Sequence, residues 1–479
     1  MIPLPYVQEL IPSPPIELAL RALAEWPNLL LLDSSLQRSG LGRYSFLTAD
    51  PFELFEESNE YGSYPFSRVN EILNSFPATT IPDLPPFQGG AAGVLTYELG
   101  HCFERLPVPK WNPFQLPGAV IGVYDWTLAW DHDRGRCWFI GQGFPEEKEM
   151  IRLARAETQC REIQAALTRA AGHKSSTSHD DWNSRDAANL FPPEMPLHPL
   201  PFLPDLQSRF DHGGYLTAVQ RVIDEIYAGE IFQANLSQQL FIPAAINPIE
   251  QYISLRKQNP APFAGFFTHD DWAILSSSPE RFVQKQGDIV STRPIKGTRQ
   301  RRHIPEADLF SRDELRESEK DRAENVMIVD LLRNDFSRVC LPGSIRVPEL
   351  CLVEAYETVS HLVSEVRGQL RPGFSFWDLL QATFPGGSIT GAPKIRAMEI
   401  ITEIEQVARG AYCGSLFYSG FDGTADSSIL IRTMTQRHGW LSLPAGGGIV
   451  AQSHPEEEYQ ETLHKVRGLL NALARSTDS

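Results

Sequence analysis

The spacing of apolar residues predicts a chain that mixes helices with strands. Leu29–Asp33 and Ala92–Leu99 are short apolar runs typical of buried strands, whereas Glu146–Ala170 is long and charged and predicts a helix. After Asp211, apolar residues recur at helical spacing as far as Gly229, a residue type that often ends helices. These apolar residues are Leu216, Val219, Val222, Ile223 and Ile226. The chain contains no repeat of fixed period, which argues against a solenoid or a propeller.

The segment from Ile231 to Ile242 changes to a period of two, which predicts a strand. Its apolar face would carry Phe232, Ala234 and Leu236. Its polar face would carry Gln233, Asn235, Ser237 and Gln239.

A C-terminal helix is predicted to begin near Ser453, which has the spacing of a capping box with Glu456. Glu458, Glu461 and Lys465 follow at i, i+3 and i+7 and would share one face. On its own, this face is also typical of a solvated surface with one salt bridge. The apolar stripe of the same helix would consist of Tyr459, Leu463, Val466, Leu470 and Leu473.

A second helix carries a similar acidic pair. Asp321 and Glu324 are one turn apart and lead into an apolar run that should be buried. Buried carboxylates are costly unless positive charge meets them. Two acidic pairs on two helices could therefore frame a divalent cation with oxygen ligands, which suits Mg²⁺.

A change in composition divides the chain into three parts. The segment 172–205 is rich in Ser, His, Asp and Pro, and it has six prolines between Pro192 and Pro204. Neither a helix nor a central strand accommodates so many prolines. We interpret it as an exposed connection between an N-terminal segment, 1–171, and a longer C-terminal region, 206–479.

The composition restricts the possible partners. The 479 residues include 60 acidic and 43 basic side chains, giving a net charge of −17, which argues against nucleic acid as the main partner. We predict no membrane span and no secretory leader. The six cysteines are scattered without a Cys-x-x-Cys pair, so they predict neither a zinc site nor a disulfide framework. These features are typical of a cytoplasmic protein.

Five ordered motifs change this general picture. The segment Arg293-Pro-Ile-Lys-Gly-Thr-Arg299, together with four further blocks, resembles the chorismate-utilising enzymes. The other blocks are 277–282 (SSPERF), 359–364 (VSHLVS), 384–394 (FPGGSITGAPK) and 446–450 (GGGIV). The resemblance is thinner before residue 211, where 30–35 and 42–46 are similar to the amino-transferring members. It implies an α/β (α+β) fold in which two facing, largely antiparallel sheets are flanked by helices, with the active site in the cleft between them.

The family chemistry implies a role for each matching residue. Chorismate has two carboxylates and a ring hydroxyl that must leave, so its site needs cations and a proton donor. By resemblance, Glu324 and Glu461 hold Mg²⁺, with Asp321 and Glu458 nearby, and the metal binds the ring carboxylate. The substrate contacts implied are Gln233, Thr298, Tyr412, Arg432, Gly446, Gly448 and Lys465. The glycine-rich stretch 386–391 would offer further N–H groups to an anion.

Two further residues match family positions beside the substrate ring. Glu280 matches the general acid that protonates the leaving hydroxyl, so its surroundings should raise its pKa. His361 matches a position near the ring, although a purely structural histidine is an alternative interpretation.

Two positions distinguish the branches of the family. Gln233 stands where the water-adding members have a Lys that activates water, so the resemblance favours amino transfer. Lys296 stands where anthranilate synthases have Ala. By resemblance, Lys296 would add covalently to ring C2 before ammonia adds at C4, giving 4-amino-4-deoxychorismate for 4-aminobenzoate and folate biosynthesis. The alternatives are an anthranilate synthase, a lysine Schiff-base enzyme and a non-catalytic ligand-binding subunit.

The ammonia source and a regulatory ligand complete these expectations. The chain has no Gly-x-Cys-x-Gly nucleophile elbow, so we expect a separate glutaminase subunit. In anthranilate synthases, the segments corresponding to Asp33 and Ser34 and to Pro262 and Phe263 form a tryptophan pocket. Both segments differ here from the anthranilate pattern, so tryptophan would be a structural ligand or would not bind.

Overall fold

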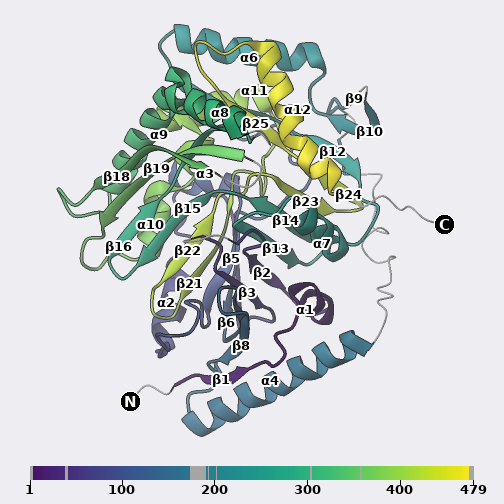
Figure 1. The fold of residues 1–479 in the computed structure, drawn as a ribbon, viewed down its shortest axis with the longest axis vertical. Helices are drawn as coiled ribbons and strands as arrows, with labels where there is room; N and C mark the ends of the chain where they lie inside the picture. The colour runs from purple at the N-terminus through teal and green to yellow at the C-terminus, as the bar shows by residue number, and fades with distance from the viewer. Residues whose placement is uncertain are drawn as a thin grey trace.

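Two large antiparallel sheets form the body of the molecule (Figure 1). The computed structural model describes residues 4–37, 41–172, 190–192, 194–200, 202–301, 305–355 and 359–473. The strands of the first sheet, in spatial order, are β1 (Tyr6–Glu9), β8 (Arg136–Gly141), β7 (Trp126–Asp131), β3 (Tyr44–Thr48), β2 (Leu30–Asp33), β13 (Phe263–His269), β14 (Trp272–Ser278), β23 (Thr433–Arg437), β24 (Trp440–Ser442), β12 (Leu240–Pro243), β10 (Leu203–Ser208) and β9 (His198–Leu200).

The second sheet has the same antiparallel pairing, and a short third sheet accompanies it. The second sheet runs β17 (Ile295–Gln300), β19 (Val359–Gln369), β16 (Ile289–Thr292), β15 (Arg281–Gln286), β22 (Ala425–Ser428), β21 (Ser415–Gly420), β5 (Gly90–Leu95), β6 (Ala119–Tyr124) and β4 (Glu53–Glu57), with β18 (Arg346–Ala355) also paired to β19. The third sheet consists of β20 (Gly391–Ala392), β11 (Gln233–Gln238) and β25 (Ala445–Ile449).

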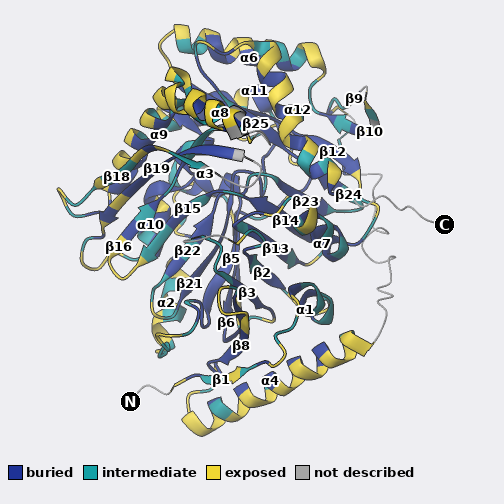
Figure 2. Cartoon of the chain, viewed as in Figure 1, coloured by how far each residue is buried: buried dark blue, intermediate teal, exposed yellow. Residues whose placement is uncertain are grey.

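The alternation of side chains shows how the layers pack. On one face of the first sheet, Leu31 and Phe266 pack into a core that also contains helices. On the other face, their neighbours Leu30 and Phe267 pack into a core with side chains of β5, β6 and β21 of the second sheet. The two sheets therefore face each other across a shared apolar layer, as expected from the sequence. Most of the strands are buried, and the outward faces of the helices are exposed (Figure 2).

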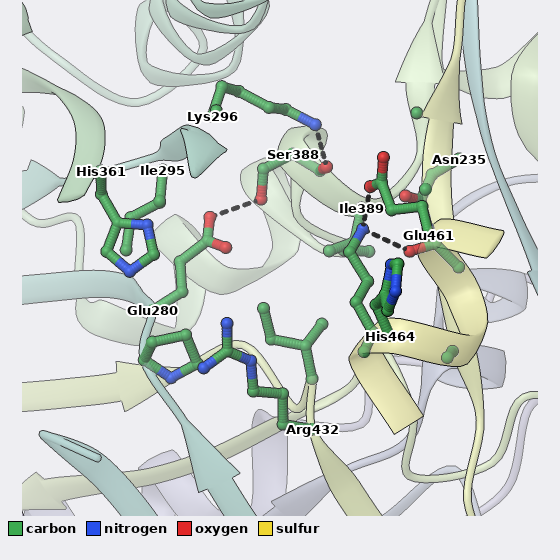
Figure 3. A pocket seen from close by; sticks show the side chains of 18 of the residues that line it. Asn235, Glu280, Ile295, Lys296, His361, Ser388, Ile389, Arg432, Glu461 and His464 are labelled. Atoms are coloured by element: carbon green, nitrogen blue, oxygen red, sulfur yellow. Dashed lines mark hydrogen bonds and ion pairs between the residues drawn. The ribbon is translucent and has the colours of Figure 1, made fainter. Parts of the chain in front are cut away.

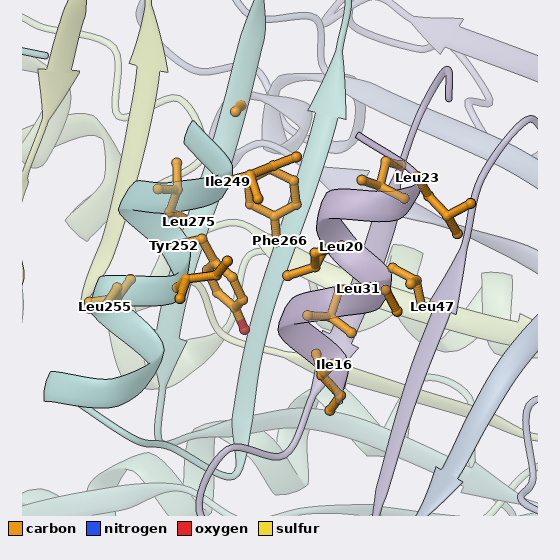
Figure 4. Close-up of a cluster of buried hydrophobic side chains, with 14 of the residues drawn as sticks. Ile16, Leu20, Leu23, Leu31, Leu47, Ile249, Tyr252, Leu255, Phe266 and Leu275 are labelled. Carbon is orange, nitrogen blue, oxygen red and sulfur yellow. The ribbon is translucent and has the colours of Figure 1, made fainter. Parts of the chain in front are cut away.

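Helices cover the outer faces of both sheets. In Figure 4, side chains of α1 (Ile16–Ala22) and α7 (Pro248–Gln258) pack with those of β2, β3, β13 and β14. The outer core of the second sheet includes α9 (Glu319–Ser337) and α10 (Phe376–Thr383), and that of the third includes α6 (His212–Tyr227) and α11 (Lys394–Glu405). The remaining helices are α2 (Ser67–Ser75), α3 (Gly100–Phe103), α4 (Glu149–Gly172), α8 (Pro305–Glu317) and α12 (Pro455–Asn471).

The predicted helices after Asp211 and near Glu146, and the strand Leu29–Asp33, are confirmed as α6, α4 and β2. The predicted strand Ala92–Leu99 ends early, at Leu95, because Tyr97–Leu99 form the 3₁₀ helix η1. In η1, the Glu98 carboxylate accepts hydrogen bonds from the backbone N–H groups of Arg409 and Gly410.

The prediction of one alternating strand from Ile231 to Ile242 is wrong. The segment divides into β11 and β12, which belong to different sheets. Every residue of β11 is buried, because α6 and α11 cover it, while Phe232 is 70% exposed.

The predicted capping box at the start of α12 is also wrong. The N-cap is His454, and the Ser453 hydroxyl instead donates to Glu458 Oε1 at 2.6 Å. The predicted apolar stripe is confirmed, because Tyr459 and Val466 are buried and Leu463, Leu470 and Leu473 are partly buried against the core.

The N-terminal segment and the C-terminal region share both large sheets. β2 pairs with β13 in the first sheet, and β5 pairs with β21 in the second. Most of the predicted connection, 173–189 with 193 and 201, lies outside the described residues, but its last part contributes β9 and the start of β10 at a sheet edge. All six cysteines are free and buried. Among the helices described, none has the length and apolarity needed to cross a membrane.

Candidate functional site

A cavity of about 660 Å³ opens where the chain passes between the two large sheets. Glu280 lies between β14 of the first sheet and β15 of the second. Arg432 lies between β22 of the second sheet and β23 of the first, where the chain returns to the first sheet. The two crossings are joined by a hydrogen bond from Ile429 N to Glu280 O at 3.0 Å. The predicted site residues that line this cavity are Glu280, Lys296, Asp321, Glu324, His361, Tyr412, Arg432, Gly446, Gly448, Glu458, Glu461 and Lys465.

Ser388 joins Lys296 to Glu280 (Figure 3). Lys296 Nζ donates to the Ser388 carbonyl oxygen at 3.0 Å, and Ser388 Oγ donates to Glu280 Oε1 at 2.7 Å. Ser388 belongs to the 3₁₀ helix η3 (Gly387–Ile389), within the glycine-rich motif. One short element thus holds an amine and a carboxyl group on the same side of the cavity.

A bulge in β17 directs Lys296 toward the cavity. The register between β17 and β19 shifts between Lys296 and Thr298, and the intervening Gly297 has a φ of +71°. A Cβ at Gly297 would lie 2.9 Å from the Asp321 carboxylate, so a glycine is needed for both its conformation and the available space. His361 of β19 is 2% exposed and pairs with Thr298 of β17. The side chain of Thr298 lies outside the described part of the structure.

Burial changes the protonation of both reactive groups. Desolvation raises the pKa of Glu280 to about 7, although the hydrogen bond from Ser388 and the charge of Lys296 oppose that rise. Desolvation also lowers the pKa of Lys296, while Glu324 and Glu280 oppose that change. The raised pKa agrees with the expectation for Glu280, since it lets a protonated carboxyl group exist near neutral pH. The catalytic roles of both residues stay predictions.

The cavity also contains cationic side chains. Among the described residues, the Arg432 guanidinium has neither a hydrogen-bond nor an ion-pair partner, and burial lowers its pKa. Lys465 Nζ donates to Gly446 O at 2.8 Å and pairs with Glu461 at 2.6 Å. Tyr412 is 4% exposed in the same wall. An unpaired guanidinium and a lysine that line one cavity are suited to an anionic ligand.

Three of the four predicted metal ligands lie around the glycines of β25, and the fourth, Asp321, lies beside Gly297 of β17. A Cβ at Gly447 would lie 3.3 Å from oxygens of both Glu458 and Glu461, and a Cβ at Gly448 would lie 3.7 Å from Glu324 Oε2. The glycines therefore leave open the space between these carboxylates. Burial raises the pKa of Glu324, and the nearby charges of Asp321 and Glu458 add to the rise. This concentration of negative charge fits a divalent cation with oxygen ligands.

Lysine and arginine side chains already contact three of these carboxylates. Glu461 pairs with Lys465, Glu458 lies 3.6 Å from Lys320, and Asp321 lies 3.1 Å from Arg299. Glu324 has no hydrogen-bond or ion-pair partner among the described residues. It is the carboxylate most in need of a further cation.

Gln233 occupies a different place from the other predicted residues. It is 1% exposed, and its Nε2 fills the space that a Gly448 side chain would need. It is not among the residues that line the cavity, so its contact with substrate stays a prediction. Several lining residues were not selected from the sequence, among them the polar residues Asn235, Lys320, Ser388 and His464. Asn235 and Ser388 belonged to segments already singled out, but nothing in their local sequence distinguished them from their neighbours.

A buried ion pair supports the cavity wall. Arg409 makes two hydrogen bonds to Glu405, at 2.7 and 2.9 Å, and donates to the carbonyl oxygens of Ile389 and Asn235. Glu405 also accepts the N–H and hydroxyl of Ser237 at 2.7 and 2.9 Å. Because Ile389 and Asn235 line the cavity, this cluster fixes the backbone of two of its walls.

A second cavity, of about 420 Å³, contains all four residues of the predicted tryptophan pocket. Asp33, Ser34, Pro262 and Phe263 meet there where β2 pairs with β13. The Asp33 carboxylate already accepts hydrogen bonds from Ser45, Tyr252 and Arg256, so an amine bound there would need another acceptor. Tryptophan binding stays a prediction.

The fold and the cavity define an enzyme site for a small polyanion, built at the crossings between two antiparallel sheets. The chain belongs to the chorismate binding enzyme family, which matches residues 34–471. It is 41% identical over 389 residues to aminodeoxychorismate synthase component 1 of Klebsiella aerogenes, covering 81% of this chain and 78% of that protein.

Anthranilate synthases are similar as well. The chain is 38% identical to anthranilate synthase component 1 of Thermus thermophilus, over 82% of this chain and 79% of that protein. The crystal structure of anthranilate synthase component I from Streptococcus pneumoniae superposes with a TM-score of 0.74 at 29% identity, over 91% of this chain and 93% of that one.

Proposed function

We propose that this chain converts chorismate and ammonia to 4-amino-4-deoxychorismate. The observation that carries the proposal is the arrangement Lys296–Ser388–Glu280, in which one serine holds an amine and a carboxyl group with a pKa of about 7 in one cavity. The identity to aminodeoxychorismate synthase component 1 of Klebsiella aerogenes supports it.

The reaction requires two displacements. The neutral Lys296 amine adds to ring C2, the ring double bonds shift, and the C4–O bond breaks as Glu280 gives its proton to the departing hydroxyl. Ammonia then adds at C4, the double bonds shift back, and the C2–N bond to Lys296 breaks. One water is released overall, and the lysine and the carboxyl group are regenerated after proton return. Burial favours the required starting states, a neutral amine and a protonated carboxyl group.

We propose that Arg432 and Lys465 orient the substrate in the cavity. Arg432 can bind two oxygens of the enolpyruvyl carboxylate at once, and Lys465 adds a second positive charge. Tyr412 and the Gly446–Gly448 backbone complete that side of the cavity. The ring would then lie toward Glu280 and Lys296.

We also propose that Glu324 and Glu461 hold Mg²⁺, with Asp321 and Glu458 nearby. When bound, Mg²⁺ would act as a Lewis acid on the ring carboxylate. The open space at Gly447 supports this assignment, as does Glu324, which has no hydrogen-bond or ion-pair partner in the described part of the chain. Glu324→Gln and Glu461→Gln should each require about tenfold more Mg²⁺ for half-maximal activity, because a charged ligand is lost. The exposed neighbour Glu457→Gln serves as control, and an unchanged Mg²⁺ titration in both variants would contradict the assignment.

Ammonia is proposed to come from a separate glutaminase subunit. The word "component" in the names of the similar proteins supports a partner chain. The isolated chain should therefore accept an ammonium salt but not glutamine as its nitrogen source.

The deciding experiment identifies the product. The purified chain is incubated with chorismate, Mg²⁺ and an ammonium salt, a lyase is added, and the aromatic acid is identified by chromatography. We expect 4-aminobenzoate from the natural chain. Lys296→Ala should reduce its formation by about 1000-fold or more, because the covalent route is lost. Anthranilate as the main product of the natural chain would overturn the proposal in favour of an anthranilate synthase.

A further inference from the structure

A second group of possible metal ligands lies at the other end of β14 from Glu280. His269 ends β13, Asp270 lies in the turn that follows, and Glu56 comes from β4 at the edge of the second sheet. Because a strand advances about 3.3 Å per residue, this turn lies about 20 Å from the Glu280 end of β14. One ligand atom from each of the three residues lies within 4.8 Å of the other two. The group is therefore separate from the carboxylates of the large cavity.

The imidazole of His269 is held in one orientation. It is 4% exposed, and its Nδ1 lies 2.7 Å from Asn28 Oδ1. Since an amide oxygen only accepts hydrogen bonds, Nδ1 carries a proton and Nε2 carries the lone pair of the neutral ring. Nε2 is buried, has no hydrogen-bond partner among the described residues, and faces the carboxylates of Glu56 and Asp270.

A lone pair that faces two carboxylates needs a positive charge between them. The distances from His269 Nε2 are 3.3 Å to Glu56 Oε1 and 3.5 Å to Asp270 Oδ2. A charge-assisted N–H···O bond would be shorter, at about 2.7–2.9 Å. In a tetrahedral site with bonds of about 2.0–2.1 Å, neighbouring ligand atoms are about 3.3–3.5 Å apart. Both distances therefore match ligands that share a metal ion better than a proton-mediated pair.

We propose that His269, Glu56 and Asp270 form a binding site for a divalent transition-metal ion, with Zn²⁺ the best fit and water as the fourth ligand. One imidazole nitrogen with two carboxylates suits Zn²⁺, whereas Mg²⁺ prefers six oxygens. Asn28 supplies the outer hydrogen bond that commonly orients a ligating histidine. Because Glu56 and Asp270 are 54% and 78% exposed, an ion can enter from solvent.

The surrounding backbone fixes the geometry of this site. Asn28 and Asp270 both have left-handed backbone conformations, with φ of +50° and +47°. The carbonyl of Asn28 accepts a hydrogen bond from the buried Tyr124 hydroxyl at 2.9 Å. A bound ion would link the β13–β14 turn of the first sheet to β4 of the second. It should therefore stabilise the contact between the sheets.

The test measures Zn²⁺ binding to the full-length chain after treatment with a chelator. Millimolar Mg²⁺ is kept present to occupy the carboxylates of the large cavity, and Zn²⁺ is titrated by calorimetry with a parallel thermal melt. We expect one Zn²⁺ per chain and a rise in Tm. Glu56→Gln combined with Asp270→Asn should weaken binding at least about 100-fold and abolish the rise, because both charged ligands are lost.

Two variants make the result specific. Asn28→Gly tolerates the left-handed backbone but removes the outer hydrogen bond, and it should weaken Zn²⁺ binding about 10- to 100-fold. Glu53→Gln changes another exposed carboxylate of β4 and should leave binding unchanged. Equal Zn²⁺ affinity in the natural chain and the double variant would overturn the proposal. So would the absence of stoichiometric binding, which would leave the site as a protonated histidine between two carboxylates.

Discussion

The large cavity and the ion-pair cluster beneath it contain the same kinds of charged side chain, but they differ in how those side chains are paired. The Arg409 guanidinium bonds to Glu405, Ile389 O and Asn235 O, whereas the Arg432 guanidinium has no partner among the described residues. Buried polar groups without partners are costly, so a structure retains few of them. The comparison indicates that Arg409 stabilises the fold and that Arg432 is available for a ligand.

The carboxylates differ in the same way. Glu405 accepts hydrogen bonds from Arg409 and from both the N–H and the hydroxyl of Ser237. Glu280 receives one side-chain hydrogen bond, from Ser388, and burial raises its pKa to about 7. The few hydrogen bonds to Glu280 leave its buried carboxyl group able to exchange a proton near neutral pH.

The largest effect is expected from breaking the buried ion pair between Arg409 and Glu405. Arg409→Met should lower the free energy of unfolding by about 3–5 kcal/mol, because Glu405 would be left charged and unpaired in the interior. Urea unfolding followed by circular dichroism measures the change. Arg221→Met, which breaks an exposed pair with Glu403, is the control and should cost less than about 1 kcal/mol. Equal losses in the two variants would contradict the distinction.

A smaller effect, of a different kind, is expected at the unpaired arginine. Arg432→Gln should lower kcat/KM for chorismate about 100-fold, since bonds from a guanidinium to a carboxylate contribute about 1.5–3 kcal/mol. Its unfolding free energy should stay within about 0.5 kcal/mol of the natural value, because no protein partner is lost. A large loss of stability with unchanged kcat/KM would show that Arg432 is structural.

The smallest effect concerns the pH dependence of the rate. The rate should fall as the pH rises through about 7, because Glu280 then loses the proton it must donate. Ser388→Ala removes a hydrogen bond that favours the charged carboxylate, so the pKa of Glu280 should rise and the falling limb should move up by about one pH unit. Ser415→Ala, a buried serine away from the cavity, is the control. An unshifted limb would show that Ser388 does not affect Glu280.

The sequence predicted the sheet architecture, and most of the catalytic, substrate-binding and metal-ligating residues selected from it line the cavity. Lys296 and Glu280 stand in short contiguous motifs, so their positions were readable without a structure. Ser388 was not selected, since its contacts lie 92 residues from Lys296 and 108 from Glu280 along the chain. Such long-range contacts leave no periodic signal.

Tertiary contacts also explain the misplaced element boundaries. Ser453 has the right spacing for a helix cap, but its hydroxyl donates a hydrogen bond to Glu458 instead. β11 alternates in sequence, yet none of its residues is exposed, because helices cover Ala234 and Leu236 on one face and Asn235 on the other face lies in the cavity wall. Ser453 has a competing partner five residues along the chain, whereas β11 is covered by elements that are distant in sequence, and both contacts override the local pattern.

The sharing of both sheets between the two ends of the chain affects how the protein must be synthesised. β5 ends at Leu95, but its partner β21 begins at Ser415, roughly 320 residues later. At about 5–20 residues per second on the ribosome, β5 would wait about 16–64 s for that partner. The nascent N-terminal strands would expose unpaired edges during this time, so we expect them to need chaperones and to misfold when translated alone. The chain therefore reaches its native sheets only near the end of translation.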